Sequence, residues 1–117
     1  MLKIYLKVMK ALSDKTRIKI IKMLQASEMC VCEIQAALGL SQPSVSKQLR
    51  VLEEAGLVES RKDGLWVIYR LADTAESAYA DHMQSILRDW LNDDQEIQKT
   101  IQQASLADRC EITGRCR

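Results

Sequence analysis

The sequence contains no phenylalanine, and aromatic residues fill only 4% of its 117 positions, whereas hydrophobic residues fill 47%. Its core must therefore be built from Leu, Ile, Val, Ala and Met, a composition typical of packed helices. A chain of this length forms one domain and is small for an enzyme that carries its own deep cleft. Because His82 is the single histidine and no glycine-rich phosphate-binding loop is present, we expect no enzyme activity.

Long apolar runs are also absent. No run approaches the roughly 20 residues that cross a bilayer, and residues 1–10 alternate charged with apolar groups instead of forming a signal sequence. We therefore expect a cytoplasmic protein with no membrane partner. Thiols stay reduced in that compartment, so the four cysteines are expected to be ligands or redox groups and not a disulfide framework.

The sequence also lacks a large excess of positive or of negative residues, since the net charge is +1. The charges are nevertheless segregated: residues 1–27 hold seven basic residues and one acidic residue, and residues 73–108 hold two basic and eight acidic. A strongly basic chain would favour nucleic acid through its overall field. Here DNA binding has to be inferred from the local pattern instead.

Apolar residues recur at spacings of three and four, which predicts a chain of amphipathic helices. Residues 57–61 and 65–71 are strand-like and flank Lys62-Asp63-Gly64, a turn that favours a β-hairpin. The helices are predicted over residues 2–12, 15–25, 31–38 and 42–55, and as two more within 74–106 with a break near 92–94.

Capping signals set the limits of these helices. Ser13-Asp14 precedes the second helix, and Gly39 ends the third because it tolerates a left-handed conformation. Ser41 caps the fourth, with Pro43 in the first turn, where a missing N–H costs nothing. We expect residues 1–107 to form the domain and residues 108–117 to form a flexible tail that contains two cysteines.

Helices, a helix-turn-helix and then a hairpin form the order of a winged helix-turn-helix domain, mainly α with a β-hairpin wing. Residues 28–71 resemble the ArsR/SmtB family of bacterial metal-sensing repressors. "EMCVC" ahead of "LGLSQPSVSKQLRVLEEAGLV" is similar to the arsenic-responsive branch of that family. The likeness extends to "LSDKTRIKIIKML", to "RKDGLWVIYRL" and to the cysteine-bearing tail, and implies a repressor of a resistance operon.

The fourth helix is the predicted DNA-reading element. Its polar face carries short hydrogen-bonding side chains near the N-terminus, the end that enters the major groove. Basic side chains there and at the hairpin tip can bind guanine or phosphates. The candidate DNA-binding residues are Gln42, Ser44, Ser46, Lys47, Gln48, Arg50, Arg61 and Lys62.

The terminal helices carry more apolar residues than a small core needs, so we expect a two-fold homodimer on an inverted-repeat operator. The stripes consist of Leu2, Tyr5, Leu6 and Met9 at one end and of Tyr79, Met83, Ile86, Leu87, Trp90 and Leu91 at the other.

Cys30 and Cys32 are the candidate inducer ligands. Positions i and i+2 lie about 200° apart on a helix, so both can reach one ion only where the helix begins. We predict Cys30 in the cap and Cys32 in the first turn, where the helix N-terminus should lower the thiol pKa. Binding should displace this helix and then the DNA-reading helix, which pack together through Ile34, Leu38, Val45 and Leu49.

The donors favour arsenite or antimonite as inducer, with no organic cofactor. The zinc-sensing branch of the family uses Asp and His on the helix after the wing, and here only Asp81 and His82 are present. Trivalent arsenic or antimony takes three thiolates, or two and a small ligand. Cadmium and lead, which are also thiophilic, stay as alternatives, as does a redox or reactive-sulfur sensor, although a disulfide between such close cysteines would be strained.

The third ligand is open. The arsenic branch often has a third cysteine where this chain has Gln35. Cys110 and Cys116 in the tail are loose thiols, or one of them supplies that ligand, or the two form a separate two-thiol site that does not affect DNA binding. An extended tail from Leu106 reaches roughly 14 Å at Cys110 and 35 Å at Cys116, so it can approach the start of the third helix.

Overall fold

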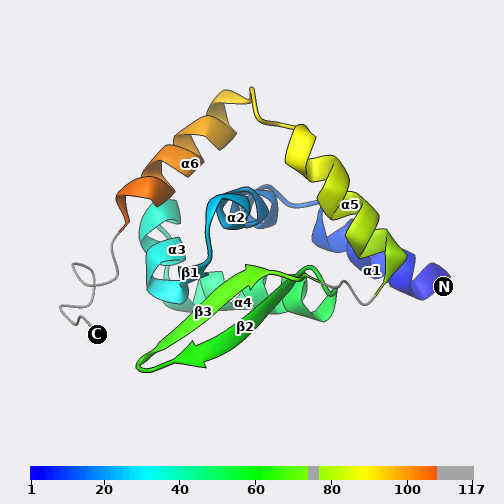
Figure 1. Cartoon of the computed structure of the whole chain (residues 1–117), viewed down its shortest axis with the longest axis horizontal. Coiled ribbons are helices and arrows are strands. Elements are labelled where there is room, and N and C mark those ends of the chain that lie inside the picture. The colour runs from blue at the N-terminus through cyan, green and yellow to red at the C-terminus, as the bar shows by residue number, and fades with distance from the viewer. Residues whose placement is uncertain (74–76, 108–117) are drawn as a thin grey trace.

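The computed structural model describes residues 1–73 and 77–107 (Figure 1). Six helices and three short strands follow one another within these residues. Their bounds are α1 Leu2–Ala11, α2 Lys15–Ala26, β1 Met29–Cys30, α3 Val31–Leu38, α4 Gln42–Glu54, β2 Val58–Asp63, β3 Trp66–Leu71, α5 Ala78–Asp89 and α6 Gln95–Leu106.

The predicted capping signals lie where the helices begin and end. The Asp14 carboxylate accepts a hydrogen bond from the Arg17 N–H at 3.1 Å, and the Ser41 hydroxyl accepts one from the Ser44 N–H. Gly39 ends α3 with φ +69, a left-handed conformation that a β-carbon would strain. The prediction of the helices and of the hairpin is therefore confirmed for the described residues.

One strand was not predicted. β1 is a two-residue strand that pairs antiparallel with β3 in a sheet of order β1-β3-β2, with Cys30 opposite Ile68. Two residues are too few to show the alternation that identifies a strand. The strand forms because β3, paired with β2 on one side, leaves its other edge open to the chain segment that enters α3.

Helix α2 lies in the middle of the fold, with α1, α4, α5 and α6 around it and the β2–β3 hairpin extending below (Figure 1). Its buried face includes Ile20, Ile21 and Leu24, which belong to one apolar cluster with Ile34 of α3 and Leu49 of α4. This single core fixes α3 and α4 relative to each other.

A buried lysine determines the corner between α5 and α6. The Lys22 side chain is only 1% exposed, and its ammonium group donates to the Leu87 carbonyl at 2.8 Å and to the Asn92 side-chain oxygen at 2.7 Å. Burial lowers its pKa. Because an ammonium group is favourable beside the last carbonyls of a helix, Lys22 both ends α5 and fixes where α6 starts.

Helices α1 and α5 lie side by side at one end of the molecule (Figure 1), where the rings of Tyr5 and Tyr79 pack edge to face with centroids 5.4 Å apart. Leu2 remains 71% exposed, Leu6 54% and Trp90 58%. This apolar surface is therefore left uncovered by the chain itself. None of the described helices is long and apolar enough to cross a membrane.

Candidate DNA-binding surface and thiol site

Helix α4 exposes most of the side chains that were predicted to read DNA. Gln42, Ser44, Lys47 and Arg50 are exposed, whereas Val45, Leu49 and Leu52 on the opposite face are fully buried. This division follows from the helical period, because residues three and four apart share a face. Among the described residues, no salt bridge engages Lys47 or Arg50.

Two of the predicted residues are already held by neighbours. Ser46 and Gln48 are half-buried. The Ser46 hydroxyl accepts a hydrogen bond from the Gln42 side-chain amide at 2.8 Å, and the Gln48 side-chain oxygen accepts one from the Arg17 guanidinium at 2.7 Å. Arg17 also donates to the Ala11 carbonyl at 2.7 Å, so it joins the end of α1 to the middle of α4.

The wing contributes Arg61 and Lys62, both exposed, from β2. The Arg61 guanidinium makes a two-point contact with the Glu28 carboxylate at 2.8 and 2.5 Å, and this hydrogen bonding raises the pKa of Arg61. Glu28 directly precedes β1, so the ion pair joins the wing to the segment that leads into the cysteines. A phosphate would have to replace this carboxylate before Arg61 could bind DNA.

The wing is also joined to α4. The Ser60 hydroxyl donates to the Glu53 carboxylate at 3.1 Å. Tyr69 on β3 is half-buried, and its pKa is raised first by burial and then by the negative charge of Glu53. The sheet and α4 therefore share a polar contact, besides the core that they cover.

Cys30 and Cys32 lie where they were predicted, at the cap and in the first turn of α3. The Cys30 N–H donates to the Glu33 carboxylate at 2.8 Å, and the Glu33 N–H in turn donates to the Cys30 sulfur, so the two residues cap the helix reciprocally. The Cys32 side chain hydrogen-bonds with that of Cys30. The two sulfurs therefore meet at the helix start in spite of their spacing.

The expected lowering of the thiol pKa is wrong for Cys30. Its side chain is 1% exposed, and burial, followed by the hydrogen bond with Cys32, raises its pKa from the ordinary 9.0 to about 12. The Glu33 N–H acts in the opposite direction, as a helix N-terminus should, but the loss of hydration is larger. The resting site therefore holds Cys30 as a neutral thiol.

The sequence did not reveal that the thiols contact the wing. Cys30 forms a small apolar cluster with Trp66 and Ile68 of β3, and Cys32 packs against it. Trp66 and Ile68 are two residues apart on one strand and hence point to the same face. Residues 65–69 are a continuous apolar run, so the sequence did not show which face is buried, and only the pairing of β1 with β3 places the cysteines on the face of Trp66 and Ile68.

The part of the chain that the structure describes offers no third ligand near this pair. In residues 1–73 and 77–107, no three His, Cys, Asp or Glu side chains lie close enough to hold a metal ion together. His82 is exposed on α5, and its Nδ1 lies 2.7 Å from the Ala78 carbonyl. Cys110 and Cys116 lie outside the described residues.

Comparison with known proteins defines the class. A family model described as "Bacterial regulatory protein, arsR family" matches residues 14–60, from α2 into β2. The chain is 31% identical to HlyU from Vibrio cholerae, with a TM-score of 0.62, 74% of this chain covered and 89% of that one. The chain is 29% identical to the homodimeric winged helix-turn-helix DNA-binding domain of Mb0332 from Mycobacterium bovis, with a TM-score of 0.64. The match covers 74% of this chain and 77% of that domain. The fold is therefore that of a winged helix-turn-helix regulator, a class that is distinct from enzymes.

Two relatives narrow the class to a family. The arsenic resistance transcriptional regulator ArsR2 of Pseudomonas putida is 38% identical over 90 residues, which cover 74% of this chain and 78% of the relative. The arsenical resistance operon repressor of Escherichia coli is 44% identical over 68 residues, 57% of this chain and 58% of the relative. That match spans little more than half the length of the relative. The chain belongs to the ArsR family.

Proposed function

We propose that this protein is a transcriptional repressor that binds operator DNA as a metalloid-free dimer and releases it when trivalent arsenic or antimony binds Cys30 and Cys32. The observation that supports it best is the position of the two sulfurs. They meet at the start of α3, next to both elements that would contact DNA. Relatives named as regulators of arsenic resistance support the choice of inducer.

DNA recognition is assigned to α4 and the wing. Gln42, Ser44, Lys47 and Arg50 are exposed on α4, and side chains of these types bind base edges and phosphates in the major groove. Lys62 is exposed on the wing, and a lysine there can bind a phosphate of the DNA backbone.

A dimer follows from the apolar surface of α1 and α5. One module of this size covers too little DNA for selective binding. Pairing through Leu2, Leu6 and Trp90 would bury the exposed surface and repeat α4 about a two-fold axis. The homodimer in the description of the Mb0332 domain supports this assembly, and the matching operator is an inverted repeat.

The raised pKa of Cys30 helps to choose among thiophilic inducers. Each thiol that replaces a hydroxide of neutral arsenous acid gives its proton to that hydroxide, so that one As–S bond forms and one water leaves. A divalent cation has to displace the thiol proton itself, which a pKa of about 12 opposes near neutral pH. The site therefore favours arsenite and antimonite over cadmium and lead.

Two sulfurs leave one position of a three-coordinate arsenic open. A hydroxide can remain there, and Cys110 or Cys116 can replace it if the tail reaches α3. Gln35 is half-buried one turn further along the helix and offers no thiol.

Inducer binding acts on two elements. Ile34 of α3 shares the core with Val45 and Leu49 of α4, which gives the route to the DNA-reading helix. Cys30 is also paired with Ile68 and packed on Trp66, which gives a route to the wing. Binding that turns Cys30 out of its cap would break the contacts with Glu33 and β3 together. A coupling free energy of about 1–3 kcal/mol between inducer and operator is sufficient.

The test first selects a DNA duplex that the reduced protein binds from a random library. The complex is then titrated with arsenite and, separately, with cadmium. We expect operator release and thiol–arsenic absorption to share one midpoint with arsenite. Normal release by a Cys32→Ser variant would refute the proposed ligands.

A redox sensor is the second candidate, favoured by the contact between the two sulfurs and by the likeness to HlyU, which has also been solved in a form described as reduced. In that case an oxidant or a persulfide donor releases the operator without arsenite. Release by oxidant alone, reversed by a dithiol, would favour this alternative.

A further inference from the structure

Helix α1 carries a row of three lysines that the proposed function does not use. Lys3, Lys7 and Lys10 are four and three residues apart and so share one side of the helix, and all three are exposed. α1 contains no acidic residue, and among the described residues no salt bridge engages these lysines. Like charges at such spacing destabilise a helix slightly, so the row needs another explanation.

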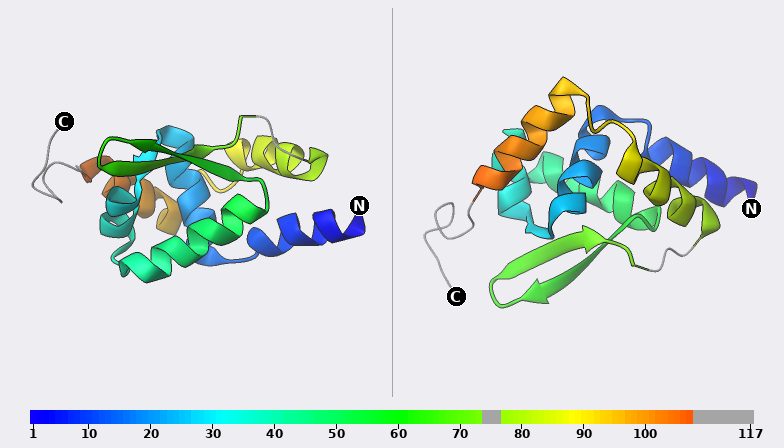
Figure 2. Two further views of the ribbon diagram at one scale, coloured as in Figure 1. Left: turned by 90° about the horizontal axis from the view of Figure 1, so that it is seen from below. Right: turned by 45° about the horizontal axis from the view of Figure 1, so that its top comes forward.

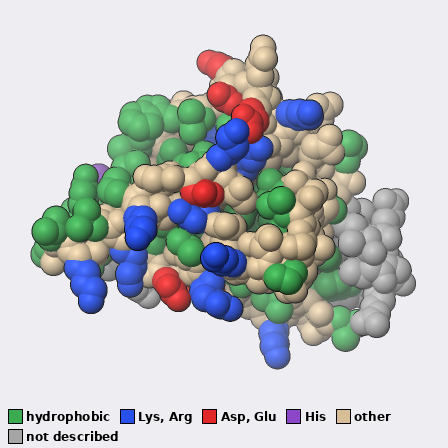
Figure 3. All heavy atoms as spheres, turned by 180° about the vertical axis from the view of Figure 1, so that it is seen from behind, with side chains coloured by type: hydrophobic (Ala, Val, Ile, Leu, Met, Phe, Trp, Pro, Cys, Tyr) green, Lys and Arg blue, Asp and Glu red, His purple; other side chains and the backbone are tan. Residues whose placement is uncertain are grey.

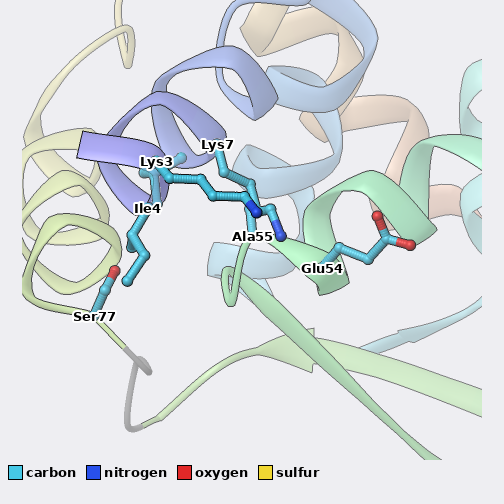
Figure 4. Close-up of a pocket in the computed structure, with 7 residues that line it drawn as sticks. Lys3, Ile4, Lys7, Glu54, Ala55 and Ser77 are labelled. Carbon is cyan, nitrogen blue, oxygen red and sulfur yellow. The ribbon is translucent and has the colours of Figure 1, made fainter. Parts of the chain in front are cut away.

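Two of these lysines converge. Lys3 and Lys7 line a hollow of about 290 Å³ between α1, the end of α4 and the start of α5. Figure 4 shows both side chains extending from α1 in the same direction, toward Ala55 in this view, with the Glu54 carboxylate turned away. Two neighbouring ammonium groups attract an anion more strongly than either one alone.

The row continues the surface of α4. Arg17 holds the end of α1 against Gln48, which places Lys10 beside the middle of α4. In the left view of Figure 2, α1 continues the line of α4 along one edge of the molecule. Figure 3 shows Lys and Arg side chains gathered along the lower part of the face that carries α1 and α4.

We infer that Lys3, Lys7 and Lys10 bind phosphates of operator DNA outside the bases that α4 reads, an inference that rests on the proposed DNA-binding function. The partner is a polyanion with regularly spaced charges, which matches a row of cations one helical turn apart. Because the lysines contact only the backbone, they add affinity without sequence preference. They account for three of the seven basic residues that the chain concentrates in its first 27.

The competing explanation is structural. Ammonium groups near the last turn of α4 interact favourably with its dipole and would stabilise the fold without any ligand. That explanation predicts a lower melting temperature for lysine variants and an unchanged dependence of DNA affinity on salt.

The experiment compares Lys3→Gln/Lys7→Gln with Arg88→Gln/Lys99→Gln, a variant of the same net charge whose changes lie on the exposed sides of α5 and α6. Affinity for a duplex selected by the wild-type protein is measured between about 50 and 200 mM KCl, together with that for a scrambled duplex. We expect the first variant to bind both duplexes at least roughly tenfold more weakly at about 100 mM salt. Because the dimer carries four of these lysines, its log–log salt slope should be shallower by about 3.6.

The control variant should keep the wild-type slope. An unchanged slope in Lys3→Gln/Lys7→Gln, with only the melting temperature lowered, would overturn the inference while leaving the proposed function intact. An equal change in both variants would also overturn it, because the effect would then come from net charge. If the wild-type protein selects no duplex at all, both the inference and the proposed function fail.

Discussion

Helix α4 and the wing differ in how they contact the segment that carries the cysteines. α4 meets α3 through apolar side chains of the common core, and its exposed residues Lys47 and Arg50 engage in no salt bridge among the described residues. The wing shares strand pairing, a buried cluster and the Glu28–Arg61 ion pair with the segment that carries the thiols. A conformational change at Cys30 should therefore affect the wing more directly than it affects α4.

The sharpest consequence concerns the Cys30 thiol. In the reduced native protein we expect Cys30 to react with iodoacetamide at pH 8 roughly a thousandfold more slowly than in the urea-unfolded chain, because a pKa of about 12 in place of 9.0 leaves far less thiolate. The rate at which Cys30 reacts should keep rising until the pH reaches about 12. Mass spectrometry that distinguishes label on Cys30 from label on Cys32 measures this rate. Equal rates in the native and the unfolded protein would contradict the burial of Cys30.

The next largest effect separates DNA binding from induction. Cys32→Ser should bind the selected operator with wild-type affinity, since Cys32 lies away from the exposed face of α4. The arsenite needed for release should rise by roughly 5- to 150-fold, the range that a lost coupling of this kind spans. Fluorescence anisotropy of labelled operator gives both quantities. His82→Ala is the matched control, and it should leave the dose unchanged.

A smaller effect tests the wing route itself. In a Trp90→Phe variant, Trp66 is the remaining tryptophan, and it packs against Cys30. Arsenite should then change the tryptophan emission at the same concentration at which the operator is released. The reciprocal Trp66→Phe variant, which reports only the exposed Trp90, should show little change. Release without any change at Trp66 would mean that the signal passes through α3 and α4 alone.

The smallest effect concerns the ion pair at the base of the wing. Glu28→Gln frees Arg61 for phosphate. Because an exposed ion pair contributes little, operator affinity should increase only roughly 1.5- to 5-fold, with a steeper salt dependence. Glu59→Gln, which removes one of the two ion pairs of Arg70, serves as the comparison. Weaker operator binding by Glu28→Gln would show that the pair holds the wing in its binding position.

The sequence by itself determined the features that depend on neighbours along the chain. Asp14 and Ser41 cap their helices, Gly39 takes the left-handed conformation that ends α3, and Cys30 and Cys32 lie at the start of that helix as their spacing required. Helical periodicity likewise separated the exposed side of α4 from its buried side. Such signals act over a few residues, so the sequence displays them directly.

The tertiary structure alone decided the chemistry of the thiol site. The pairing of Cys30 with Ile68 joins positions 38 residues apart, and no local pattern indicates which strand edge is left open to receive it. Burial against Trp66 then outweighs the helix N-terminus and raises the pKa of Cys30, where the local sequence alone predicted a lower value. Likewise, Arg61 was predicted at a charged turn, but its contact with Glu28 exists only because β1 and β2 flank the same strand. Desolvation and non-local pairing depend on which surfaces meet, and that is fixed only when the core has assembled.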